Sequence, residues 1–163
     1  MAGFQVYIYP NDWTLWNDAQ TVKEGLDVAA SALENHGSIT GYSIDIRLDM
    51  PGVPDWDTFE TWRKSHHSDQ GIHFWLTGSY GTGLANGGDS SENGWNAPMD
   101  AKIHTGTADF WGYKQELAVQ ECLHPCLWSP AIDEWIGNDE HELGTSRWID
   151  GSWKVTPMAV SYE

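Results

Sequence analysis

Gln120-Glu121-Cys122-Leu123-His124 is the stretch of this 163-residue sequence from which we infer the fold. The sequence predicts a helix from about residue 108 to residue 124, with Thr107 as its N-cap. Residues 120 and 124 are four positions apart, so their side chains project from one face of that helix. Two ligand-type side chains at this spacing, with a Glu beside the first, suit a bound metal ion and a general base. The stretch therefore suits a metal site on a helix, and an ion pair between Glu121 and His124 at the helix end is the alternative.

Three residues further along the chain extend this prediction. His141 follows the stretch, and Met158 and Tyr162 lie near the end of the sequence. An imidazole such as that of His141 can serve as a metal ligand. Each residue also has a simpler interpretation. His141 could cap the turn that follows it, Met158 could be an ordinary core residue, and Tyr162 could belong to a frayed terminus.

In this order of residues the chain resembles the metzincin family of zinc metallopeptidases. That family has a His-Glu-x-x-His helix, a third His after it and a Met-containing turn beneath the metal. The resemblance implies zinc as the cofactor, held by Gln120, His124 and His141, with Met158 as the floor of the site. It also implies two catalytic residues, Glu121 as the general base and Tyr162 as an oxyanion stabiliser.

The sequence departs from the family pattern in ways that leave two functions open. Gln120 replaces a His, and an amide oxygen is a harder, poorer donor for zinc than imidazole. His141 lies further from His124 than the family's third His does, and Tyr162 follows Met158 by four residues. The first function is a divergent zinc-dependent metallopeptidase with a degenerate site. The alternative is an inactive metzincin-like binding or structural protein, extracellular or virion-associated.

Hydrophobic patterning predicts the remaining elements and one domain over residues 1–163. Apolar and polar residues alternate in the predicted strands 4–9 and 42–48, and residues 71–77 form an apolar strand. Apolar residues recur every three or four positions in the long first helix. We expect strands at 4–9, 42–48, 71–77 and 101–104, and helices at 13–35, 57–64 and 108–124, with Asp57 capping the second helix. The fold class is α+β: a metzincin-like (zincin) domain. It would have a twisted mixed sheet, a long N-terminal helix on one face and a C-terminal site helix packed near it.

The resemblance also suggests where a partner binds. The strand from Ile72 to Thr77 would match the edge strand along which family members lay out a peptide or protein substrate, and pairing with an edge strand is physically natural. His73 and His104 fall on two predicted strands and could meet across the sheet. Without a third ligand they are better interpreted as half-buried polar residues.

The charge balance narrows the class of partner. The chain has 24 acidic and 8 basic residues, a formal net charge of −16. Such a surface repels nucleic acid and anionic lipid, because phosphate binding depends on Lys and Arg. The 11 Trp residues argue for a packed core rather than disorder. An acidic folded chain with few Lys resembles halophilic, archaeal proteins, and an ordinary acidic protein is the alternative.

The two cysteines and the N-terminus carry weaker signals. Cys122 and Cys126 are four apart on the predicted helix, where parallel Cβ vectors suit a disulfide poorly, so we expect two buried thiols. A bridge stays possible if Pro125 ends the helix. The sequence contains neither a signal peptide pattern nor an 18-residue apolar run. We therefore expect a chain that does not enter a membrane, either extracellular after loss of a leader, which we favour, or cytoplasmic.

Overall fold

The computed structural model describes residues 4–36, 39–79, 81, 84–85, 98–106, 118–119, 121–122, 146–149 and 152–155. Its elements follow in the order β1 (Phe4–Pro10), the 3-10 turn η1 (Trp13–Leu15), α1 (Trp16–His36), β2 (Tyr42–Ile46), α2 (Trp56–His66), β3 (Gly71–Thr77), β4 (Leu84–Ala85), β5 (Pro98–His104), β6 (Ser146–Ile149) and β7 (Ser152–Val155). None of the helices in this described part is long and apolar enough to cross a membrane.

Five strands form the main sheet in the order β2-β1-β3-β5-β4. The first four are parallel to one another, and only β4 runs antiparallel, against β5. The chain is thus a mixed domain of helices and strands, as the sequence predicted, with a sheet that is mainly parallel. β6 and β7 form a separate two-stranded antiparallel sheet.

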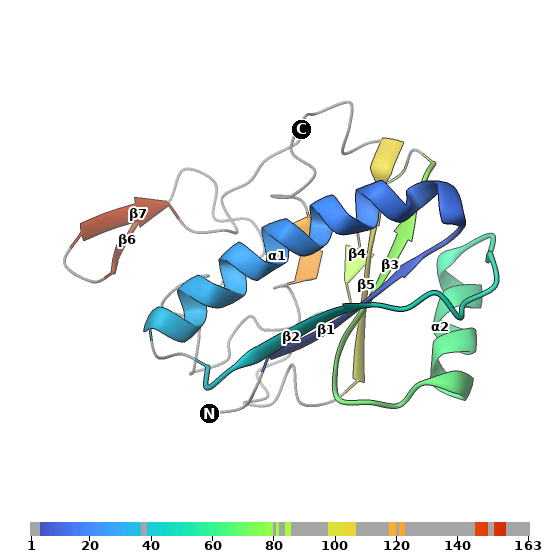
Figure 1. Cartoon of the computed structure of the whole chain (residues 1–163), viewed down its shortest axis with the longest axis horizontal. Helices are drawn as coiled ribbons and strands as arrows, with labels where there is room; N and C mark the ends of the chain where they lie inside the picture. Colours follow the sequence, from blue (N-terminus) through green and yellow to red (C-terminus); the bar gives the residue numbers. More distant parts are fainter. Residues whose placement is uncertain are drawn as a thin grey trace.

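α1 covers an apolar face of this sheet. Phe4, Val6 and Ile8 alternate along β1 and are buried in one cluster with Ala19, Val22 and Leu26 of α1. Alternate residues of a strand point to opposite faces, so these three side chains define the α1 face. Figure 1 shows α1 lying diagonally across the strands. The amphipathic first helix expected from the sequence is confirmed. Its first three residues, Trp13–Leu15, form the 3-10 turn η1.

α2 packs on the opposite face, which is aromatic. Tyr7 and Tyr9 of β1 point away from α1 and form a second cluster with Phe59 of α2 and Trp75 of β3. The strand order explains why α1 and α2 cover opposite faces of the sheet. α1 connects β1 to β2 in one direction, whereas α2 returns the chain past β1 to β3. Right-handed crossovers in opposite directions place their helices on opposite faces of a sheet.

The described residues of the predicted site helix belong to the α1 face. Residues 118–119 and 121–122 are helical. Ala118 and Cys122, one turn apart, are buried in the same cluster as α1. The expectation that the last helix packs near the first is therefore confirmed for these residues. Cys122 is buried, as expected, and Cys126 lies outside the described residues.

Three sequence-based expectations need correction. The strand Ile72–Thr77 is part of β3, which is paired with β1 on one side and β5 on the other, so it is an interior strand and offers no free edge. The second helix begins at Trp56, and its cap is Asp55, not Asp57, because the Asp55 side chain accepts from the Thr58 backbone N–H at 2.8 Å. The segment between the predicted strands 71–77 and 101–104, where no strand was expected, contains β4.

Candidate functional site

Of the predicted site residues, the structure describes Glu121. Its side chain is 2% exposed and lies on the helical residues that pack against the α1 face. Carboxylates are almost never buried in proteins unless they are paired or take part in a functional site. The other predicted site residues lie outside the described part of the chain: Gln120, His124, His141, Met158 and Tyr162.

Helical geometry relates Glu121 to its neighbours in the motif. Ala118 and Cys122 face the core, and a residue advances about 100° around a helix axis at each step. The sequence period therefore predicts positions 120 and 124 on the side of the helix away from Ala118 and Cys122. Within the described residues, no group of three His, Cys, Asp or Glu side chains is arranged to hold a metal ion.

The two strand histidines do not meet. His73 is in register with Asp100, whereas His104 is in register with Thr77, four residues further along β3. Four residues of a strand span about 13 Å. The His104 Nδ1 atom lies 2.9 Å from the Ser79 hydroxyl, and burial followed by the nearby Lys102 lowers the pKa of His104. The idea that His73 and His104 form one cluster is therefore wrong.

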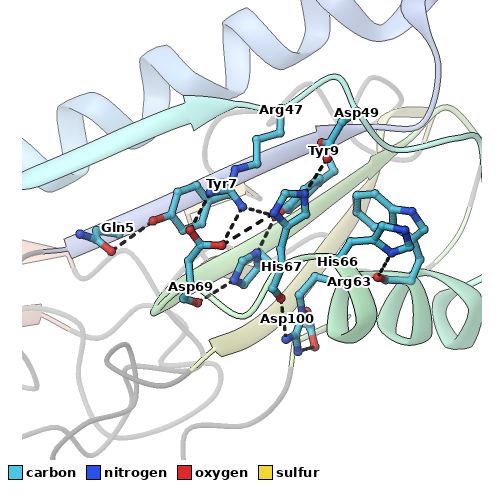
Figure 2. A network of polar contacts seen from close by, with 12 residues as sticks. Gln5, Tyr7, Tyr9, Arg47, Asp49, Arg63, His66, His67, Asp69 and Asp100 are labelled. Atoms are coloured by element: carbon cyan, nitrogen blue, oxygen red, sulfur yellow. Dashed lines mark hydrogen bonds and ion pairs between the residues drawn. The ribbon is translucent and has the colours of Figure 1, made fainter.

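His73 instead belongs to a polar circuit on the α2 face, which Figure 2 shows at close range. The Tyr9 hydroxyl lies 2.7 Å from His73 Nδ1 and accepts from Arg47 Nη1 at 2.9 Å. Arg47 also donates to both carboxylate oxygens of Asp69, at 3.1 and 3.0 Å. His73 Nε2 closes the circuit, 3.0 Å from the backbone oxygen of Asp69. We call these four residues, Tyr9, Arg47, Asp69 and His73, the Tyr9 circuit.

The partners fix the protonation state of His73. A backbone oxygen can only accept, so Nε2 carries the hydrogen and donates to Asp69. Nδ1 is then the acceptor for the Tyr9 hydroxyl. Burial, opposed by the hydrogen bond to the Asp69 backbone, lowers the pKa of His73 from 6.5 to about 4. The imidazole is neutral at pH 7, which matches the pattern of donors and acceptors.

The pKa values of the other members of the circuit shift in the directions that their contacts require. The hydrogen bonds from Arg47 lower the pKa of Asp69 from 3.8 to about 2. Burial raises the pKa of Tyr9 despite the opposing Arg47. For Arg47, burial lowers the pKa, but the hydrogen bonds to Asp69 and Tyr9 outweigh it and raise the pKa overall. The Arg47 guanidinium also lies 3.8 Å from the centre of the Tyr7 ring.

A buried ion pair lies deeper on the same face. Arg63 of α2 donates from Nε and Nη2 to the two carboxylate oxygens of Asp100 on β5, at 2.7 and 2.6 Å. Both side chains are buried. A bidentate pair of this kind holds α2 in a fixed position over the sheet. Because both oxygens of Asp100 accept from Arg63, this carboxylate has a structural role.

The histidines at the end of α2 have different surroundings. His66 is exposed and stacks on Trp62, with ring centroids 4.8 Å apart. His67 is the C-cap of α2, and its Nε2 lies 2.7 Å from an Asp49 carboxylate oxygen. His66 thus matches the solvated helix end that the sequence suggested, whereas His67 joins α2 to the segment after β2.

Motif analysis of the sequence missed the Tyr9 circuit because its members come from four separate segments. The signal in the sequence was the presence of polar residues at strand positions where a purely apolar core would have apolar ones. Tyr7 and Tyr9 alternate with apolar residues in β1, and His73 and Asp100 interrupt β3 and β5. The alternation indicated that a second, polar face existed, although not which side chains would pair.

The chain matches no family model, no curated protein and no solved structure. The indications of its function are therefore the motif at residues 120–124, the sheet and the buried carboxylate of Glu121.

Proposed function

We propose that this chain is a divergent zinc-dependent metallopeptidase-like protein on a metzincin-like domain. The observation that carries the proposal is the position of Glu121. The buried carboxylates among the described residues are Asp100 and Glu121. Glu121 is the residue that the motif assigns as general base, and it lies on a helix packed against the core.

The donor set fits zinc. In this proposal Gln120, His124 and His141 supply an amide oxygen and two imidazole nitrogens. Catalytic zinc sites commonly use three protein ligands and leave one position for water or substrate. A bound zinc ion would supply Lewis acidity toward the peptide carbonyl and toward water. Glu121 would take the proton from the attacking water, Tyr162 would stabilise the oxyanion, and Met158 would lie beneath the ligands.

The edge strand β4 is the place in this sheet for an extended peptide. An interior strand such as β3 has no backbone groups to spare, whereas an edge strand presents a row of N–H and C=O groups. In the described sheet, β4 pairs only with β5. β5 is also the strand that precedes the site helix along the chain. A peptide paired with β4 would therefore lie near the segment that carries Glu121.

A non-catalytic binding protein is the second candidate, and Gln120 favours it. The amide is a weaker zinc ligand than the imidazole it replaces, so the site could have lost its metal while the domain kept its groove. Retention of Glu121, the general base of the motif, favours the enzyme, since a binding protein does not need a base.

A peptidase assay on the zinc-supplemented protein in concentrated salt tests the enzyme. Glu121→Gln keeps the shape of the side chain but removes the base, and should abolish peptide cleavage. Glu24→Gln, an exposed position on α1, is the matched control and should leave cleavage unchanged. A wild type that neither binds zinc nor cleaves peptide would support the binding protein, and equal cleavage by the wild type and Glu121→Gln would refute the assigned base.

A further inference from the structure

The connector between α2 and β3, residues 67–70, is held to the sheet mainly through Asp69. His67 is partly buried, whereas the other three residues are exposed. Asp69 makes three hydrogen bonds to the body of the domain: two to Arg47 through its carboxylate and one to His73 through its backbone oxygen. All three belong to the Tyr9 circuit. The attachment of Asp69 therefore depends on the state of that circuit, whereas His67 at the start of the connector is held separately by Asp49.

The circuit is satisfied for only one protonation state of His73. The Tyr9 hydroxyl accepts from Arg47 and needs an acceptor for its own hydrogen, which is His73 Nδ1. If Nδ1 gains a proton it becomes a donor, and the Tyr9 hydrogen loses its acceptor. Buried polar groups without partners are expensive, by about 1–3 kcal/mol each. Protonation at this one atom therefore disrupts the bonds of its neighbours as well.

The surrounding charges also oppose a positive charge on His73. From β1 it is faced by Tyr7, whose ring stacks on the imidazole at 5.1 Å, and by Tyr9. Arg47 comes from the segment after β2, Arg63 from α2, Asp69 from the connector and Asp100 from β5. His67 of the connector contacts the Tyr9 ring. Asp100 favours a positive charge on His73, but burial and the two arginines, Arg63 and Arg47, oppose it and lower the pKa of His73 overall.

We propose that the Tyr9 circuit is an acid-sensitive latch, in which protonation of His73 releases Asp69 of the connector from Arg47 and His73, while His67 stays bonded to Asp49. Release would expose Tyr9 and His73, which are fully buried in the closed form. α1 and its core cluster contain no member of the circuit and remain folded. This latch does not depend on the proposed metal site, since none of its four members is a proposed zinc ligand.

The direction of the pH dependence follows from linkage. His73 has a pKa of about 4 when the latch is closed, against 6.5 for an unperturbed histidine. The open form therefore binds more protons between pH 6.5 and pH 4. The latch is fully stable above that range and loses stability as the pH falls through it. Between pH 7 and pH 5 the equilibrium for opening shifts by about twentyfold.

Hydrogen exchange measured by mass spectrometry on the full chain tests the latch. Rates at each pH are corrected for the intrinsic pH dependence of exchange. We expect protection of the connector, residues 67–70, to fall about twentyfold from pH 7 to pH 5, while Ile72 and residues 16–36 of α1 stay protected. His66→Gln, which changes an exposed histidine next to the connector, should behave as the wild type, whereas His73→Gln should show no such pH dependence.

Two results would overturn the latch. One is an equal loss of protection in α1, which would indicate global acid unfolding. The other is an unchanged pH response in His73→Gln. If His73→Gln does not fold, the imidazole of the wild type is titrated by nitrogen NMR. A hydrogen on Nε2 and protonation coincident with the loss of protection support the latch, and a hydrogen on Nδ1 at pH 7 contradicts it.

Discussion

Arg63 and Asp100 form a buried, bidentate ion pair that ties α2 to β5, with N–O distances of 2.7 and 2.6 Å. The residues lie 37 positions apart in the sequence, and their side chains are 5% and 0% exposed. Taking one partner away leaves the other charge buried without compensation, which is more costly than the pair itself is stabilising.

We therefore expect Asp100→Asn to lower the free energy of unfolding by about 3–5 kcal/mol. The matched control is Asp27→Asn, which removes the partially exposed i,i+4 pair between Lys23 and Asp27 and should change stability by about 0.5 kcal/mol or less. Urea denaturation of the two variants beside the wild type measures both values. Similar small losses in the two variants would show that the buried pair does not anchor α2.

Gly71 begins β3 with a φ of 122° and lies against β1. A Cβ at this position would be 2.6 Å from the backbone oxygen of Gln5. Gly71→Ala should destabilise the protein by about 1–3 kcal/mol, because the backbone conformation is unfavourable for any residue with a side chain. Gly41→Ala is the control, since its Cβ would meet only a Glu34 carboxylate oxygen at 3.8 Å. Equal denaturation midpoints for the two variants would contradict the close approach.

Tyr9→Phe isolates the hydroxyl at the centre of the Tyr9 circuit. Without that oxygen, Arg47 Nη1 loses an acceptor and His73 Nδ1 loses a donor. We expect a loss of about 1–3 kcal/mol in the free energy of unfolding at pH 7.5. Tyr42→Phe removes a hydroxyl from a more exposed ring and should change stability by less than about 0.5 kcal/mol. If Tyr9→Phe is as stable as Tyr42→Phe, the circuit contributes nothing to the fold.

A substitution at Gln120 is expected to strengthen a function, whereas the substitutions above are expected to weaken the fold. Restoring the imidazole that the family motif has at this position should tighten zinc binding, since imidazole is the better donor for this ion. Gln120→His is titrated with zinc beside the wild type and Gln20→His, a control on α1 away from the motif. An unchanged dissociation constant in Gln120→His would mean that residue 120 is not a ligand.

Local patterns in the sequence predicted the elements of the sheet well. Alternation in residues 4–9 and the apolar run 71–77 correspond to β1 and β3, and the spacing of Val22 and Leu26 identified the buried face of α1. These signals work because a strand or helix repeats its burial pattern over a few neighbouring residues. The cap of α2 was misplaced by two residues, because Asp55 and Asp57 are both plausible caps in the sequence.

Pairings between distant segments were not predictable from the sequence. β3 was expected at an edge, but the chain adds β1 on one side and β5 on the other. Strand order depends on which face of the sheet each crossover helix covers. The sequence of β3 contains no information about this. The same holds for Arg63 with Asp100, and for Arg47 with Tyr9. Each of these pairs requires the sheet to be assembled before its two side chains can meet.

We propose that residues 120–141 hold zinc, and the zinc content of the purified protein tests this proposal most directly. Elemental mass spectrometry is carried out on the full chain, purified in concentrated salt and supplied with zinc, for the wild type and His124→Ala, with His66→Ala as a surface-histidine control. We predict about one zinc per chain, the stoichiometry of a single site, in the wild type and in His66→Ala, and none in His124→Ala. A wild-type protein that takes up no zinc, or a His124→Ala variant that retains it, would contradict the proposed site.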